Sequence, residues 1–233
     1  MKVENAPWSL GCLAGLIVLL LGLIVNAGCA HHASKLDPPG YSFGPVARYN
    51  AAVQITARCI GMDGETYVWN GSGVIVSKDR LLTAGHIAET EGMICAFTAE
   101  DIKGQTFLIR PIAVLSSNDI DLASMGLISY TEEFNAERTR FGSVPLLGDK
   151  VCVATAYPRR EYKCGDVMMP KADPPGDIRI DLVVEPGNSG SGLYNANGEL
   201  VGIMVHTYPN RGNKQYISGG ASSLEGHLKE LMR

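Results

Sequence analysis

The sequence has no concentration of positive charge. It carries 20 Lys and Arg against 24 Asp and Glu, a net charge of −4, and its longest basic run is the pair Arg159–Arg160. Nucleic-acid binding requires basic residues gathered on one face, so we expect no nucleic-acid partner. The chain also lacks an internal repeat of fixed period and any low-complexity tract, which leaves an ordinary globular protein.

Metal-ligand spacing is absent as well. No CxxC or HxxxH pattern occurs among the six cysteines and five histidines, and close spacings of this kind are typical of zinc sites. His31 and His32 are adjacent, but they lie in a polar segment rich in Pro and Gly that has the composition of a flexible tether. We therefore expect no metal and no cofactor.

What is abundant is apolar sequence in short runs. Hydrophobic residues make up 45% of the 233, enough for one large domain or for two small ones that share a core. From residue 47 onward, β-like runs alternate with Gly, Asn and Asp at spacings of about ten residues, the pattern of a sandwich or of barrels. A polar stretch at 129–145 divides this part in two.

The last twelve residues have a different pattern. In the stretch 222–233, three leucines follow two serines at helical spacing. The sequence therefore predicts an all-β fold in two halves, at about 47–135 and 144–221, closed by a C-terminal helix at 222–233.

The N-terminal segment differs from the rest. Residues 9–30 contain no charge and are mostly apolar, which is typical of a signal-peptide core or a short membrane anchor. Two small residues precede Cys29, an arrangement similar to the lipobox of bacterial lipoproteins, in which the cysteine is acylated. Lipoprotein processing at Cys29, an uncleaved anchor and plain secretion are all open, and each places residues 30–233 outside the cytoplasm. We assign 1–29 to this signal or anchor and 30–46 to a linker.

Four cysteines remain in the part expected to fold: Cys59, Cys95, Cys152 and Cys164. An even number suits a compartment in which disulfides persist. Cys152 and Cys164 flank a stretch that looks like two strand ends joined by a loop, which favours their pairing and leaves Cys59–Cys95 by elimination. Connectivity does not follow from sequence, so free buried thiols stay open.

Three residues suggest chemistry when they are taken together. His86 follows a strand-like run in "LLTAGH", Asp121 begins the run "DLASMGLI", and Ser189 lies in the glycine-rich stretch "PGNSGSG". Each alone has an ordinary structural explanation, as a semi-buried histidine, a strand cap and a turn residue. As a set they match the needs of nucleophilic catalysis.

A serine hydroxyl becomes a nucleophile when a base accepts its proton and a third group orients the base. Histidine titrates near neutral pH and suits the base, and a carboxylate on its other ring nitrogen fixes the tautomer. The oxyanion that forms next needs backbone N–H donors, for which Gly187 and Ser189 are the candidates.

These motifs resemble those of trypsin-like serine proteases of the chymotrypsin fold. The family has three signature regions in the order His, Asp, Ser. This chain has stretches that look like them: "GSGVIV" with "LLTAGH", then "DLA", then "PGNSGS" with "NGELVGI". The likeness covers about residues 47–233, and within the family it points to Deg/HtrA-type proteases and glutamyl endopeptidases. It implies two six-stranded β-barrels with the triad in the cleft between them.

By this resemblance His86 is the general base, Asp121 orients it, and Ser189 forms an acyl-enzyme. Asp119 is a rival for the acidic role, because residues two apart in a strand share a face, but the family's acid stands directly before "LA", which favours Asp121. Asn188 stands where mammalian members have the aspartate that pairs with a newly cut N-terminus. We therefore expect no activation cleavage, and no PDZ domain after the terminal helix.

The resemblance also indicates where a specificity pocket would lie. Val183 and Val184 before the nucleophile, and the strand that contains Met204 and His206, are expected to line it. Glutamyl endopeptidases have a histidine directly after "GI", where this chain has Met204, so an apolar or small pocket is favoured over one for acidic side chains. His206 is expected at the rim or in packing.

We therefore expect an extracytoplasmic serine endopeptidase that acts on proteins or peptides, is held to the membrane by its N-terminal segment unless it is secreted, and is a monomer. The alternative is a catalytically silent protease fold that serves as a binding module at the cell surface. An α/β-hydrolase esterase would need a "GxSxG" elbow, which is absent around Ser189. A protease that processes only itself or one co-secreted partner is also open.

Overall fold

The computed structural model describes the folded part of the chain, in the ranges 49–117, 120–129, 133–134, 139–172, 177–209 and 216–233. The expectations for the signal or anchor, the linker, Cys29 and the His31–His32 pair lie outside the described residues, as does Asp119. Within the described ranges, no helix is long and apolar enough to cross a membrane.

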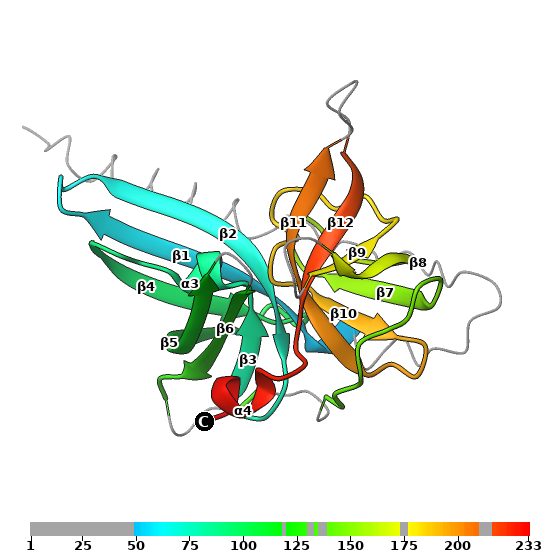
Figure 1. Ribbon diagram of the computed structural model, residues 1–233. Helices are drawn as coiled ribbons and strands as arrows, with labels where there is room; N and C mark the ends of the chain where they lie inside the picture. Colours follow the sequence, from blue (N-terminus) through cyan, green and yellow to red (C-terminus); the bar gives the residue numbers. More distant parts are fainter. Residues whose placement is uncertain (1–48, 118–119, 130–132, 135–138, 173–176, 210–215) are drawn as a thin grey trace, which may run out of the picture. The chain divides into compact units, whose positions relative to one another are not determined.

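The first half of the chain forms one closed antiparallel barrel with the strand order β1-β2-β3-β6-β5-β4 (Figure 1). Its strands are β1 (Ala52–Gly61), β2 (Thr66–Ile75), β3 (Arg80–Thr83), β4 (Met93–Glu100), β5 (Thr106–Ser117) and β6 (Ile120–Leu127). Successive side chains of each strand point alternately to the inside and the outside of the barrel. In β1, for example, Ile55, Ala57 and Cys59 are buried, whereas Arg58 and Ile60 between and after them are exposed.

The second half forms a second closed antiparallel barrel with the strand order β10-β11-β12-β9-β8-β7. Its strands are β7 (Lys150–Thr155), β8 (Glu161–Ala172), β9 (Asp177–Ile180), β10 (Gly192–Asn195), β11 (Leu200–Pro209) and β12 (Tyr216–Ser223). The predicted fold class, all-β with two six-stranded barrels, is confirmed. Each barrel has its own buried core, and the core of the first continues into residues of the second such as Tyr194 and Ile203.

The terminal helix is shorter than predicted. Helix α4 spans only Leu228–Leu231, because β12 continues to Ser223 and Gly226 adopts a left-handed backbone conformation with φ 83°. Of the three leucines, Leu224 and Leu231 are buried and Leu228 is half-buried. The helix is tied to the first barrel by a hydrogen bond from the Arg80 guanidinium to the Leu231 carbonyl oxygen, 3.3 Å long.

Both expected disulfides are present. Cys59 pairs with Cys95 and Cys152 with Cys164. In each pair the two residues lie directly opposite each other on adjacent antiparallel strands, β1 with β4 and β7 with β8, where Cβ atoms come close enough to be bridged.

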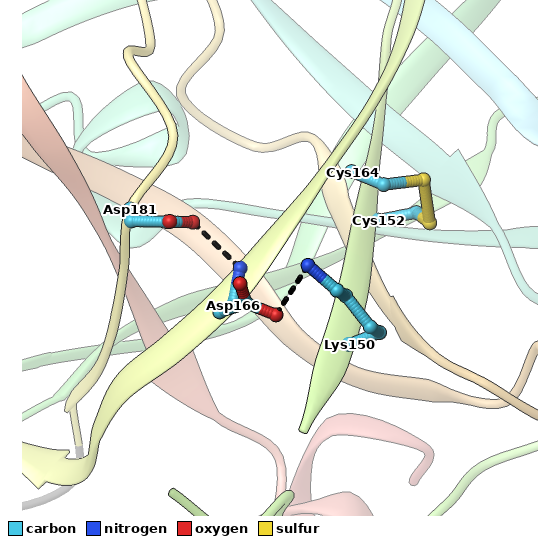
Figure 2. The surroundings of a disulfide bond; sticks show 5 residues. All are labelled: Lys150, Cys152, Cys164, Asp166 and Asp181. Atoms are coloured by element: carbon cyan, nitrogen blue, oxygen red, sulfur yellow. Dashed lines mark hydrogen bonds and ion pairs between the residues drawn. A yellow bond between two sulfur atoms is a disulfide. The ribbon is translucent and has the colours of Figure 1, made fainter. Parts of the chain in front are cut away.

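The second disulfide belongs to a small cross-linked region of the second barrel. Figure 2 shows Lys150 on β7 in an ion pair with Asp166 on β8, 2.6 Å from Nζ to Oδ1, beside the Cys152–Cys164 bond. Asp181, just after β9, accepts a hydrogen bond from the Asp166 backbone N–H at 2.6 Å. One disulfide bond and one ion pair therefore join β8 to β7, and one hydrogen bond joins β8 to the segment just after β9.

Candidate active site

His86 and Asp121 form a directly bonded pair on the first barrel. His86 lies in the single-turn helix α3 (Gly85–Ala88), which follows β3, and Asp121 is the second residue of β6. The Nδ1 atom of His86 lies 2.5 Å from Asp121 Oδ2, and the backbone N–H of His86 donates to Asp121 Oδ1 at 2.7 Å. Two contacts to one carboxylate fix the ring's direction, so that Nδ1 faces the acid.

Local packing explains why this pair can be so close. A Cβ atom on Gly85 would lie 2.6 Å from Asp121 Oδ1, so only glycine admits the carboxylate here. The indole N–H of Trp69 donates to the Ile87 carbonyl oxygen at 3.2 Å and anchors the turn that carries the histidine. The turn formed by "TAGH" therefore leaves room for the Asp121 carboxylate.

Ser222 is a contributor that the sequence did not indicate. Its hydroxyl, on β12 of the second barrel, accepts a hydrogen bond from the backbone N–H of Asp121 at 3.3 Å. The two residues are 101 positions apart, and a serine in a strand carries no local signal of such a partner. The acid of the first barrel is thus held from the second barrel as well.

Ser189 lies in a tight loop, defined here as the nucleophile loop (residues 185–190), between β9 and β10. The buried side chain of Asn188 fixes this loop: its Oδ1 accepts the Glu185 N–H at 2.8 Å, and its Nδ2 donates to the Tyr157 carbonyl oxygen at 2.8 Å. Gly187 has φ 96°, a region that side chains disfavour. The Asn188 side chain therefore fixes the conformation of the nucleophile loop.

The nucleophile loop contacts the first barrel through its backbone. The Ser72 N–H on β2 donates to the Ser189 carbonyl oxygen at 2.8 Å. Gly190, with φ 90°, is needed for this approach, since its Cβ would lie 1.8 Å from the Ser72 carbonyl oxygen. A Cβ on Gly71 would lie within 3.2 Å of both the Ser189 carbonyl oxygen and the Ile87 side chain, so Ser189 is brought next to the turn that carries His86.

The hydroxyl of Ser189 points to a backbone acceptor. Its Oγ donates to the Val205 carbonyl oxygen at 3.3 Å, and no hydrogen bond joins it to His86, both residues being among those described. The backbone N–H groups of Gly187 and Ser189 have no acceptor within the described ranges. Within the described ranges the loop therefore has two backbone amides without an acceptor, next to the Ser189 hydroxyl.

A cavity of about 220 Å³ adjoins the nucleophile loop. It is lined by residues of the loop, by Val184 just before the loop, and by residues of β11, namely Val184, Glu185, Pro186, Asn188, Ser189, Met204, Val205, His206 and Thr207. Three of the four residues expected for a specificity pocket thus line it. Val183 does not, being 48% exposed, because adjacent residues of an extended chain point to opposite sides.

The cavity's apolar wall is formed by Val184 and Met204. A Cβ atom on Gly219 would lie 2.8 Å from Met204 Cε and 3.0 Å from Val184 Cγ2, so both side chains converge on this glycine of β12. The one carboxylate of the lining, Glu185, is ion-paired with Arg159 at 3.0 Å.

Comparison with known proteins places this double barrel in a family. The sequence pattern of the trypsin-like peptidase domain matches residues 71–203, more than half of the chain. The protein belongs to the trypsin-like peptidase family. The segment that matches the family includes His86, Asp121 and Ser189.

Solved structures of other proteins give the same fold. One is the HtrA-type protease AlgW with a decapeptide, which is 16% identical with a TM-score of 0.65 over 80% of this chain. The alignment spans 64% of the AlgW chain. At this identity the likeness establishes the fold. No curated protein is similar enough in sequence to match.

Proposed function

We propose that this trypsin-like peptidase is an extracytoplasmic serine endopeptidase with His86, Asp121 and Ser189 as its catalytic residues. The observation that carries the proposal is the His86–Asp121 pair, bonded at both carboxylate oxygens, on the barrel to which the nucleophile loop is hydrogen-bonded. Family membership supports the same assignment.

In the proposed reaction Asp121 holds Nδ1 of His86, which leaves Nε2 free to take the Ser189 proton. The Ser189 hydroxyl gives up its hydrogen bond to the Val205 carbonyl oxygen, and Oγ forms a bond to the carbonyl carbon of the substrate. The Gly187 and Ser189 N–H groups receive the oxyanion. His86 then donates the proton to the leaving amine, and water hydrolyses the acyl-enzyme by the same steps.

The substrate class that we propose is a protein or peptide with a small or apolar side chain before the scissile bond. The wall of Val184 and Met204 supports this choice. His206 also lines the cavity, and we assign it to the rim.

The proposed location outside the cytoplasm has support from covalent structure. Two disulfides persist in an oxidising compartment and are rare in the cytosol. The uncharged apolar residues 9–30 supply the proposed signal or membrane anchor.

A second candidate function is a silent binding module with the protease fold. The observation in its favour is the Ser189 hydroxyl, which donates to Val205 rather than to His86. In that case the cavity would hold a peptide without cutting it.

An active-site serine probe distinguishes the two functions. One sample of the full chain is treated with a fluorophosphonate, beside a Ser189→Ala variant. Separate, untreated samples of both proteins are incubated with a proteome-derived peptide library. We expect labelling at Ser189 and cleavage after small or apolar residues in the wild type only. A folded wild type that takes no label supports the silent module, and abundant cuts after Glu contradict the apolar pocket.

A further inference from the structure

Ser72 is a buried serine on β2 whose hydroxyl reaches the loops of the second barrel. Its exposed fraction is 0%. The Oγ atom donates to the Gly187 carbonyl oxygen at 3.1 Å, and it accepts from the backbone N–H groups of Tyr157 at 3.1 Å and Ala156 at 3.3 Å. A hydroxyl has one donor and two acceptor sites, so these three bonds use its whole capacity.

The residues on either side of Ser72 explain part of the "GSG" motif. A Cβ atom on Gly71 would lie 3.2 Å from the Ser189 carbonyl oxygen, and one on Gly73 would lie 2.8 Å from an isoleucine side chain. Close packing therefore requires the glycines. It does not require a hydroxyl between them, so the serine needs its own explanation.

That explanation lies in the peptide planes of the nucleophile loop. The Ser72 hydroxyl fixes the Gly187 carbonyl, and the Ser72 backbone N–H fixes the Ser189 carbonyl at 2.8 Å. Because each peptide unit is planar, these two bonds fix the planes on either side of the one that carries the Ser189 N–H. The Gly187 N–H belongs to the peptide plane before these. The φ of 96° at Gly187 sets how that plane is turned relative to the Gly187 carbonyl.

The second partner of the hydroxyl strengthens this arrangement. The Tyr157 N–H donates to Ser72 Oγ, while the Tyr157 carbonyl oxygen accepts from Asn188 Nδ2 at 2.8 Å. The segment 156–157 is thus tied both to Ser72 and to the nucleophile loop. Three stretches of chain, one from the first barrel and two from the second, are locked by one buried side chain.

We propose that Ser72 is a positioning residue that holds the Gly187–Ser189 backbone with both oxyanion donors aimed at the reacting carbonyl. It contacts no reacting atom and acts only through the loop backbone. This inference rests on the function proposed above, and it gives the "GSG" serine a role in transition-state stabilisation.

Replacing Ser72 with alanine removes three hydrogen bonds at a buried point and keeps the size of the side chain nearly unchanged. The freed Gly187 carbonyl then turns, and with it the neighbouring donors. Removal of a whole oxyanion donor lowers kcat by about 10²–10³-fold, so we expect a smaller fall, of about 10- to 100-fold, with KM changed less than about twofold. Affinity for a peptidyl boronate, which mimics the tetrahedral adduct, should fall in parallel with kcat.

Ser124→Ala is the matched control. Ser124 is also a fully buried serine of the first barrel, but its hydroxyl has no hydrogen-bond partner among the described residues. The same atom is deleted without loosening the nucleophile loop. We expect wild-type kcat, KM and boronate affinity.

Hydrogen–deuterium exchange gives a readout that does not depend on activity. In full-length Ser72→Ala, peptides covering 156–157 and 187–191 should exchange faster than in Ser124→Ala, with other segments unchanged. If the wild type proves inactive but this local increase appears, the proposed function fails and the positioning contact stands.

Unchanged kcat and boronate affinity in a folded Ser72→Ala variant would overturn the inference, as would equal exchange in the two variants. Should Ser72→Ala fail to fold, Ser72→Cys serves instead, because a thiol keeps the shape and weakens the hydrogen bonds. A folded cysteine variant is expected to have kcat between those of wild type and a donor deletion, and wild-type kcat there refutes the role.

Discussion

Replacing Asp121 with asparagine tests the bonded pair at the centre of the site. Both oxygens of Asp121 accept from His86, Oδ2 at 2.5 Å from Nδ1 and Oδ1 at 2.7 Å from the backbone nitrogen. Asparagine has the same shape but only one acceptor oxygen. Either orientation of its amide therefore breaks one of the two contacts or reverses its direction.

If the amide oxygen faces the His86 backbone, the NH₂ group faces Nδ1 and forces the proton onto Nε2, so the ring cannot act as the base. If the oxygen faces Nδ1, two donors meet at a distance of 2.7 Å and the side chain is pushed away. The same change in a serine protease triad lowers kcat by about 10⁴-fold, which corresponds to about 5 kcal/mol of transition-state stabilisation.

The assay is single-turnover cleavage of a peptide chosen from the library digest, with circular dichroism to verify the fold. Asp119→Asn is the control, since Asp119 is the alternative acid two residues earlier, and we expect it to keep kcat within about threefold. An Asp121→Asn variant that retains more than a tenth of wild-type kcat refutes the reasoning, and loss of activity in Asp119→Asn alone reverses the assignment.

Two further substitutions test the pocket and the loop. Met204→Ala removes the side chain that meets Gly219, so the library digest should shift toward larger side chains before the cut, and an unchanged profile would show that Met204 does not limit the pocket. Gly190→Ala places a Cβ 1.8 Å from the Ser72 carbonyl oxygen at φ 90°, whereas Gly148→Ala has comparable φ, 82°, with nothing within 4 Å. In chemical denaturation we expect Gly190→Ala to lose about 2 kcal/mol more stability than Gly148→Ala, and equal losses would mean that the loop shifts freely.

Much of the fold followed from the sequence because its signals are local. Strand alternation and regularly spaced turn residues predict barrels without knowledge of which strands pair. The cysteine pairing was accessible for the same reason in one case, since Cys152 and Cys164 flank a single turn. The predicted terminal helix was too long because Ser222 and Ser223 look like a helix cap. In the structure these two serines end β12 and pair with β11.

The site was only partly accessible to sequence reasoning. His86, Asp121 and Ser189 stand in recognisable motifs, but Ser72 and Ser222 act through contacts between the barrels at long sequence separation. A hydroxyl in a strand gives no sign of such a partner. Val183 does not line the cavity beside the nucleophile loop, because the side on which an extended residue points depends on the register of its own short segment.

The two disulfides have a consequence for how this protein could be divided. Each closes a covalent ring inside one barrel, so within the described chain only the peptide between β6 and β7 joins the barrels covalently. Two separately expressed fragments, cut in that connection, would each keep one disulfide, but each would lack at least one of the three proposed catalytic residues. Peptide hydrolysis that returns when the two fragments are mixed would then measure the fraction of fragments that have associated.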